Sequence, residues 1–241
     1  MADSLAPGAP QGAGLARGAP QGAGLAWQPS LLQWTADVDV DASFSGLSRI
    51  QLDGASWLDF APGWVSGADR LFDDLVERAN WQQRSRRMYD KVVAEPRLTA
   101  YWHADGGLPL EPPSLERMRN LLSDRYGTVF DSAGMNLYRD GRDSVAWHRD
   151  RIAKEISDPI VVLVSLGEPR KFLVRPHGGG RSRAFRLGEG DLLVTGGLFH
   201  REWEHAVPKV AKAGPRISIA FRHGMVRSSY GKPDGGPHGH R

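Results

Sequence analysis

An apolar share of 40% over 241 residues is enough to bury a substantial core, in one large domain or two small ones. The absence of cysteine excludes disulfides, thiolate zinc sites and cysteine nucleophiles, and a formal net charge of +3 permits contact with phosphate-bearing partners without establishing it. No run of about 18 apolar residues and no secretory leader are visible, so we expect a cytoplasmic protein, monomeric and without membrane contact.

Both ends of the chain have the composition of disordered tails. Residues 1–26 repeat the nonapeptide G-A-P-Q-G-A-G-L-A, which begins at Gly8 and again at Gly18. Residues 228–241 are similarly rich in Gly, Pro and polar side chains. Such segments bury too little apolar surface to offset the entropy of ordering the chain. We therefore expect the folded part to span residues 27–227.

The first folded segments alternate between short strands and a helix. Ile50–Leu52 and Trp57–Phe60 have the pattern of strands, and Pro62 with Gly63 marks a turn. Ser66 and Asp69 resemble a capping box ahead of apolar residues at helical spacing, which predicts a helix over 67–79.

The segment Trp81–Arg97 mixes arginines with aromatic and branched apolar residues. Basic and aromatic side chains interleaved in this way suit a nucleic-acid surface. A solvated hairpin with a few packed apolar residues explains the same pattern equally well. A strand, Leu98–Trp102, follows this segment.

A second helix is expected after Pro112 and Pro113, with Ser114 as its N-cap and Gly127 at its C-terminal end. Its apolar stripe has the spacing of ordinary core, which predicts that the helix packs against the outside of a sheet. The members of this stripe are Leu115, Met118, Leu121 and Leu122.

After Phe130 the chain changes to short strands separated by turns, at the spacing typical of a sandwich or barrel. Two helices ahead of many antiparallel strands predict an α+β fold with a jelly-roll core and helices packed outside. We expect residues 27–130 to form the helical and lid part, and 131–227 the core. The predicted strands are Met135–Tyr138, Ile160–Leu166, Lys171–Val174, Ala184–Leu187, Asp191–Thr195, Glu204–Val207 and Ile217–Phe221.

The sharpest local signal is His148-Arg149-Asp150. Residues i and i+2 of a strand point to the same side, so the imidazole and the carboxylate converge. A second imidazole, His205, would come from another strand. Two His and one carboxylate leave positions open on the metal, as in non-haem Fe(II) oxygenases. His-x-Asp alone also occurs by chance in many proteins.

The strand R-I-S-I-A-F-R strengthens the metal hypothesis. Arg216, Ser218 and Arg222 share one of its faces, and the opposite face is apolar. Two arginines on a buried face are costly unless anions meet them, and their long side chains suit the two ends of a dicarboxylate. An edge strand with both arginines in solvent is the alternative.

Two further pairs accompany these residues. Asn136 and Tyr138 form an i, i+2 pair whose amide and phenol can hydrogen-bond carboxylate or carbonyl oxygens. Trp147 and Trp203 flank the candidate ligands, and we expect them to pack around the site.

The ordered set N-x-Y-x-x-G, H-x-D, W-E-H-A-V-P-K and R-x5-R resembles the AlkB-type dioxygenases, over roughly Met88 to His223. The resemblance implies a double-stranded β-helix, which is a jelly roll with outer helices. It also implies dependence on Fe(II), 2-oxoglutarate and O₂. The implied reaction converts 2-oxoglutarate to succinate and CO₂ and hydroxylates an N-methyl group on a nucleobase, which is lost as formaldehyde.

By the same resemblance, His148, Asp150 and His205 are the iron ligands. Arg216 would hold the distal carboxylate of 2-oxoglutarate, and Arg222 would lie near the carboxylate that chelates iron. The full set of co-substrate positions is Asn136, Tyr138, Arg216, Ser218 and Arg222.

The expected partner is alkylated nucleic acid, single-stranded or with a flipped base. Several repair members carry an acidic residue where this chain has Ile152, which leaves the preferred base open. The candidate substrate contacts are placed by their location in the chain: Tyr101 and Trp102 as an aromatic wall, Arg87 and Tyr89 as part of a lid.

Two alternatives remain beside the nucleic-acid dealkylase. The first is the same oxygenase chemistry on a protein or a small molecule. The second is a non-catalytic nucleic-acid-binding module, which retention of His148, Asp150 and His205 argues against.

Overall fold

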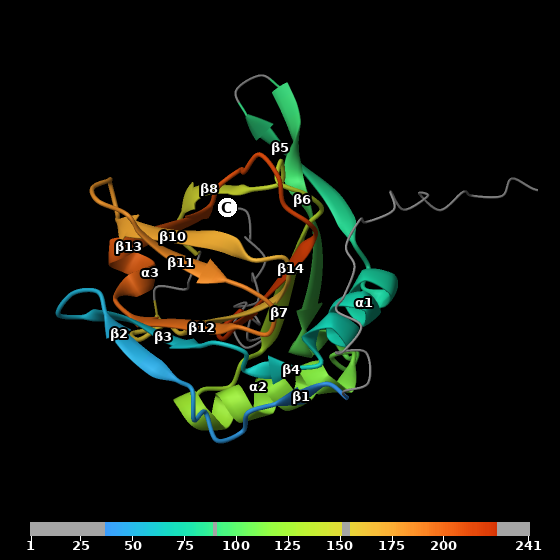
Figure 1. The fold of residues 1–241 in the computed structure, drawn as a ribbon. Coiled ribbons are helices and arrows are strands. Elements are labelled where there is room, and N and C mark those ends of the chain that lie inside the picture. The colour runs from blue at the N-terminus through green and yellow to red at the C-terminus, as the bar shows by residue number, and fades with distance from the viewer. Residues whose placement is uncertain (1–36, 89–90, 151–154, 226–241) are drawn as a thin grey trace, which may run out of the picture.

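The computed structural model describes residues 37–88, 91–150 and 155–225 (Figure 1). The predicted tails at 1–26 and 228–241 lie outside these residues. No helix in the described ranges is long and apolar enough to cross a membrane.

A large antiparallel sheet of eight strands forms one wall of the molecule. Its two central strands, β9 and β14, are flanked on both sides by hydrogen-bonded neighbours. In spatial order the strands are β2 (Ser48–Gln51), β3 (Ser56–Ala61), β12 (Leu192–Gly197), β9 (Val161–Gly167), β14 (Arg216–Arg222), β7 (Ser132–Tyr138), β6 (Lys91–His103) and β5 (Gln82–Met88).

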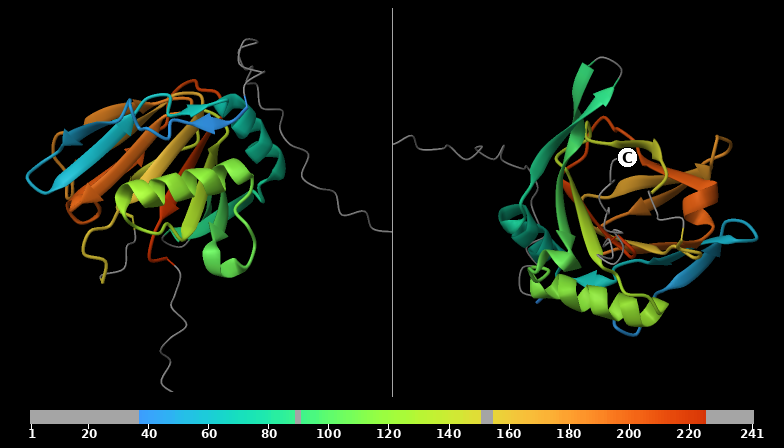
Figure 2. Two further views of the ribbon diagram at one scale, coloured as in Figure 1. Left: turned by 90° about the horizontal axis from the view of Figure 1, so that it is seen from below. Right: turned by 180° about the vertical axis from the view of Figure 1, so that it is seen from behind.

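A smaller antiparallel sheet of four strands faces the large one across the interior (Figures 1 and 2). The backbone bond from Ser144 N to Pro96 O, at 2.9 Å, links its outer strand to β6 of the large sheet. In spatial order the strands are β11 (Arg183–Leu187), β10 (Arg170–Pro176), β13 (Trp203–Val207) and β8 (Val145–His148). The shorter elements are β1 (Asp39–Val40) paired with β4 (Val65–Ser66), the 3-10 turn η1 (Ala104–Gly106) and α3 (Phe199–Glu202).

Helix α1 (Ala68–Arg78) lies outside the large sheet because one of its faces is apolar. Leu71, Phe72 and Leu75 are buried in the main core. The predicted capping box at Ser66 is wrong: the N-cap is Gly67, with φ 63°, and it makes no side-chain cap bond. Ser66 instead ends strand β4, where its hydroxyl donates to the carbonyl of Asp39.

Helix α2 (Pro113–Tyr126) covers the same outer face and buries Leu115, Met118 and Leu122. Its predicted N-cap, Ser114, is also wrong, because Pro112 occupies that position and the proline at the first helical residue sets the start. The prediction for Gly127 is confirmed: it adopts φ 62° at the C-terminal cap, where a residue with a Cβ would be strained.

The alternation of β14 separates the core from the interior space between the sheets. Ile217, Ile219 and Phe221 are fully buried against the helices. Arg216 and Arg222 belong to the opposite face, which lines a cavity between the sheets. The edge-strand alternative is wrong, because β7 and β9 flank β14 along its length.

The predicted α+β organisation, with antiparallel sheets and few helices, is confirmed. The last six predicted strands agree with β9 to β14 to within two residues at each end. Strands β5 and β6 of the segment at 81–97 pair antiparallel, an arrangement that is compatible with either interpretation of this segment. Strand β8 and helix α3, both four residues long, were not predicted.

Candidate functional site

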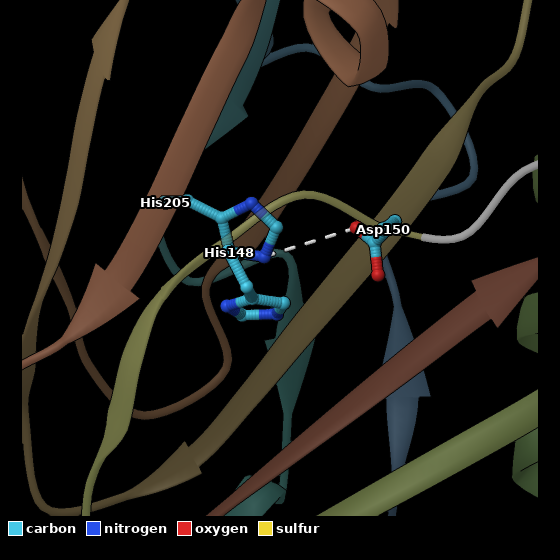
Figure 3. A group of neighbouring side chains, drawn as sticks. All are labelled: His148, Asp150 and His205. Atoms are coloured by element: carbon cyan, nitrogen blue, oxygen red, sulfur yellow. Dashed lines mark ion pairs between the residues drawn. The ribbon is translucent and has the colours of Figure 1, made fainter. Parts of the chain in front are cut away.

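Three side chains that could hold a metal ion meet where β8 ends beside β13 (Figure 3). His148 is the last residue of β8, and His205 lies opposite it in β13, with ring centroids 4.2 Å apart. Asp150 follows just beyond the strand. One ligand atom from each residue lies within 4.8 Å of the others. The convergence predicted for this triad is therefore present, although Asp150 reaches it from the segment after the strand rather than from the strand itself.

The carboxylate of Asp150 is held in a fixed position by its neighbours. Arg222 donates from Nη2 to Oδ1 at 2.7 Å, while Oδ2 lies 3.5 Å from Nδ1 of His200 and 3.8 Å from Nε2 of His205. Burial alone would raise the pKa of Asp150, but the charge of Arg222 and the His200 hydrogen bond hold it well below its usual value. The carboxylate is consequently ionised at neutral pH and available to a cation.

The two triad imidazoles present free ring nitrogens. Burial lowers the pKa of His205 to about 3, with the Asp150 charge only partly opposing it, so the ring is neutral at pH 7. Nδ1 of His148 lies 2.9 Å from the carbonyl of Ala146 and is best assigned as the donor, which leaves Nε2 with a lone pair. Neutral imidazoles and a carboxylate are the ligands that suit divalent iron.

A buried arginine lies at the far end of the adjoining cavity, which has a volume of about 130 Å³. Arg216 is 1% exposed, and its Nε donates to Ser165 Oγ at 3.0 Å. Its Nη1 has no hydrogen-bond partner among the described residues. Burial lowers the pKa of Arg216, yet a guanidinium stays protonated in proteins. A buried cation with a free donor requires an anion from outside the chain.

The walls of this cavity supply further donors. Asn136 accepts a hydrogen bond at Oδ1 from Arg97 Nε at 2.9 Å, which directs its NH₂ group away from Arg97. Burial raises the pKa of Tyr138, so its phenol keeps its proton. Ser218 and Arg222 also line the cavity, together with His148 and His205. The predicted co-substrate residues thus surround one space, whose lining also includes the two triad imidazoles.

A wider cleft of about 620 Å³ opens on the other side of His148 and Asp150. Tyr101 forms part of its wall, and the guanidinium of Arg84 lies 4.3 Å from the centre of its ring. Glu95 pairs with Arg97 Nη2 at 2.8 Å within the same cleft. Arg97 and Tyr101 line both spaces, which places this part of β6 between them.

The predicted substrate contacts divide into one that reaches the cleft and others that do not. Tyr101 lines it, but Trp102 points to the opposite side of β6, packs against the main core and donates to Leu108 O at 2.8 Å. Arg87 is exposed on β5 opposite Val92 and is not part of the cleft lining. Tyr89 and Ile152 lie outside the described residues.

Two tryptophans were expected to pack around the triad. Trp147 lines the cleft, with the guanidinium of Arg175 4.1 Å from its ring centre. Trp203 is buried in the second core cluster and donates from Nε1 to Asp53. Both therefore support the strands that carry the ligands.

Sequence reasoning missed Arg97 and His200. The i, i+4 spacing of Arg97 and Tyr101 on one strand face was a signal for the first, since both then point into the same space. His200 gave no signal, because it reaches Asp150 from the short helix α3 while its Nε2 meets Thr195 Oγ1 at 2.9 Å.

Comparison with known proteins matches residues 66–222 to the family model of the 2OG-Fe(II) oxygenase superfamily. The bovine (Bos taurus) alpha-ketoglutarate-dependent dioxygenase alkB homolog 3 is 31% identical over 219 residues, which is 81% of this chain and 73% of that protein. The human (Homo sapiens) protein of the same name is 30% identical, over 87% of this chain and 76% of its own length.

A DNA oxidative demethylase ALKBH2 from Arabidopsis thaliana is 27% identical, over 69% of this chain and 63% of that protein. Among solved structures, the protein described as OsALKBH1 superposes with a TM-score of 0.53 at 17% identity, over 73% of this chain and 99% of that chain. This last likeness supports the fold alone.

Proposed function

Because the chain belongs to the AlkB-type enzymes of the 2OG-Fe(II) oxygenase superfamily, we propose that it oxidatively demethylates N-alkylated bases in nucleic acid. Membership makes it a dioxygenase that uses Fe(II), 2-oxoglutarate and O₂. We assign its two facing sheets to the double-stranded β-helix of this family, and residues 27–227 to a single domain. Its working form is a monomer.

His148, Asp150 and His205 are the iron ligands in this proposal. Their mutual distances, the neutral state of His205 and the ionised state of Asp150 all support the assignment. When bound, the metal and 2-oxoglutarate supply the oxidation that hydroxylates the N-methyl group, which leaves as formaldehyde.

The observation that carries the co-substrate assignment is the free Nη1 of Arg216, buried in a cavity that also contains the triad imidazoles. Arg216 binds the distal carboxylate of 2-oxoglutarate through a two-point fork. Tyr138 and Asn136 donate hydrogen bonds to the same molecule, and Arg222 keeps Asp150 ionised beside it.

The chain contributes position and exclusion of water rather than the oxidant itself. The enclosed cavity orients 2-oxoglutarate between Arg216 and the triad, while the cleft holds the alkylated base against His148. Tyr101 stacks on that base, a contact that tolerates different base identities. Expulsion of water from the cavity protects the reacting groups from side reactions.

Nucleic acid is favoured over a protein or small-molecule substrate by the substrate side of the site. The guanidinium of Arg84 lies over the aromatic ring of Tyr101, and Arg87 is exposed further along the same hairpin. Relatives of the chain are named as DNA oxidative demethylases. We propose a single strand or a flipped base as the substrate, because a base within a duplex stack cannot enter a cleft.

The direct test incubates the protein with Fe(II), ascorbate, 2-oxoglutarate and a panel of DNA and RNA oligonucleotides that carry different N-methylated bases. We expect formaldehyde release in step with succinate formation on at least one of them. Good succinate turnover without formaldehyde from any methylated base would refute the nucleic-acid substrate. The oxygenase chemistry would then act on a protein or a small molecule.

A further inference from the structure

The β10–β11 hairpin is the most one-sidedly charged part of the described chain. Residues 169–188 contain six arginine or lysine residues and neither aspartate nor glutamate. The two strands pair antiparallel from 170↔187 to 174↔183. The six basic residues are Arg170, Lys171, Arg175, Arg181, Arg183 and Arg186.

Three of the six have contacts within the protein. Arg170 is buried and donates to the carbonyls of Asp140, Asp143 and Pro208. Arg175 pairs with Glu204 at 2.5 Å. Arg183 makes a long contact of 3.4 Å to the carbonyl of Gln51.

The remaining three, Lys171, Arg181 and Arg186, are exposed and have no salt bridge or hydrogen bond to any described residue. Lys171 stands directly opposite Arg186 in the register of the two strands, on the outer face of the sheet. Like charges in such cross-strand pairs destabilise a sheet. Folding alone therefore gives no reason for this arrangement.

Several exposed arginines elsewhere on the molecule are paired with carboxylates. Arg70 and Arg117, on the two long helices, are paired with Asp37 and Asp39, and Arg142 in the β7–β8 turn is paired with Asp140. Lys171, Arg181 and Arg186 have no such partner among the described residues, which concentrates positive potential on this hairpin.

This face adjoins the candidate active site. Across the small sheet, Val174 of β10 pairs with His205 of β13, and His205 pairs with His148 of β8. Strand β10 is therefore the direct neighbour of the strand that carries His205, and it lies about 10 Å from the strand that carries His148. Arg175 bridges the gap by stacking on Trp147, which lines the cleft. Figure 1 shows β8 between the β5–β6 hairpin and the β10–β11 hairpin.

We propose that the outer face of the β10–β11 hairpin binds the phosphate backbone of the nucleic acid beyond the nucleotide held in the cleft, through Lys171, Arg181 and Arg186. The inference rests on the proposed function for its partner. Nucleic acid matches the face because it presents a row of closely spaced negative charges that continues away from the site. The phosphates belong either to the continuation of the alkylated strand or to a strand paired with it.

The test uses the double variant Lys171→Ser with Arg186→Ser and a matched control, Arg70→Ser with Arg117→Ser. Each variant removes two exposed positive charges. In the control, the side chains of Arg70 and Arg117 are 60% and 53% exposed, and their ion pairs lie at the surface. We therefore expect both variants to fold. Fluorescence anisotropy measures binding to an unmethylated single strand and to its duplex over a series of salt concentrations.

We expect the hairpin variant to bind about tenfold more weakly at low salt, and the control to match the wild type. The slope of log K against log salt falls by about 0.7 for each lost contact on a single strand and about 0.9 on a duplex. Loss on the single strand assigns the phosphates to the alkylated strand, and loss confined to the duplex assigns them to its partner. Unchanged binding to both, or an equal loss in the control, overturns the proposal.

Turnover separates this inference from the proposed function. On a methylated trinucleotide the hairpin variant should equal the wild type, whereas on a long strand or duplex its KM should rise about tenfold. If the wild type releases formaldehyde from these substrates and the variant matches it at every length, only the hairpin inference is refuted. If the wild type demethylates none of them, the proposed function itself is refuted, and the binding assay still decides the surface.

Discussion

The two spaces that meet at His148 are built differently. The enclosed cavity takes most of its walls from strands that have neighbours on both sides, and its key cation, Arg216, is 1% exposed. The wider cleft is formed by the exposed part of β6 and by the segment from 144 to 150, and its aromatic wall, Tyr101, is 50% exposed. The comparison teaches that rigid, buried positions hold small groups of fixed geometry, whereas exposed positions meet the variable partner.

The largest expected effect comes from removing the metal ligands beside the enclosed cavity. Replacement of His148 and Asp150 together by alanine removes two of three ligands, so we expect succinate formation to fall by at least about a hundredfold. Succinate is measured with and without added oligonucleotide, and circular dichroism verifies the fold. Succinate formation that survives the double replacement would refute the metal assignment.

The buried imidazole gives the enclosed half a pH signature in the metal-free protein. Because the pKa of His205 is lowered from 6.5 to about 3 by burial, the unfolded chain binds this proton more readily than the folded chain. The free energy of unfolding is therefore unaffected by this group above pH 6.5. It decreases as the pH falls toward 3, by an amount on the order of a few kcal/mol.

Urea unfolding in EDTA at pH 7 and pH 4.5 measures this loss. The variant His205→Gln keeps a polar side chain without a group that titrates in this range, so it should lose less stability between the two pH values than the wild type. Equal losses in the two proteins would contradict the buried neutral state of His205.

A smaller effect is expected from a substitution that tests the binding of the distal carboxylate of 2-oxoglutarate. Arg216→Lys preserves the positive charge but removes the planar fork, so the apparent affinity for 2-oxoglutarate should fall about 10–100-fold. Arg49→Lys, at the two-point pair with the buried Asp59 outside the cavity lining, is the control and should leave the affinity unchanged. Isothermal titration with Mn(II) present reports binding without turnover, and unchanged affinity in Arg216→Lys would refute this role.

The contact of His200 with Asp150 predicts a positioning role. His200→Phe removes the nitrogen that lies 3.5 Å from Oδ2, so the apparent affinity for Fe(II) or Mn(II) should fall about tenfold. His200→Gln retains a polar group in the same place and should restore most of the affinity. Metal titration of the protein without substrate is the readout, and a Phe variant with wild-type affinity would exclude the role.

The smallest effect belongs to the exposed half. Tyr101→Leu retains an apolar side chain but loses the stacking face, so kcat/KM for a methylated strand should fall about fivefold to tenfold. The affinity for 2-oxoglutarate should fall less, because the anion is bound by Arg216 while Tyr101 only lines the edge shared by the two spaces. An equal loss of kcat/KM for the methylated strand and of affinity for 2-oxoglutarate would show that the cavity and the cleft cannot be perturbed separately at Tyr101.

The sequence was most informative where periodicity and burial coincide. The alternation of residues 216–222 predicted a cationic face, and that face does line the cavity. The His-x-Asp spacing predicted a convergent pair, which is present even though the second residue lies outside the strand.

Other features were beyond local patterns, and one was an error of reasoning. Strand β8 is too short to show periodicity. The N-caps of α1 and α2, Gly67 and Pro112, depend on the backbone conformation of the segment before each helix. Tyr101 and Trp102 do not both line the cleft beside the triad, because adjacent residues of a strand face opposite sides. His200 reaches the site only through tertiary packing.

The central claim is that one cavity holds both the metal and the dicarboxylate, with the substrate cleft outside it. A crystal structure with Mn(II) and 2-oxoglutarate, prepared without O₂, tests this claim most directly. The account predicts metal bonds to His148 Nε2, a carboxylate oxygen of Asp150 and His205 Nε2, with the distal carboxylate on Arg216. A metal bound elsewhere, or a dicarboxylate in the outer cleft with Arg216 still unpaired, would contradict it.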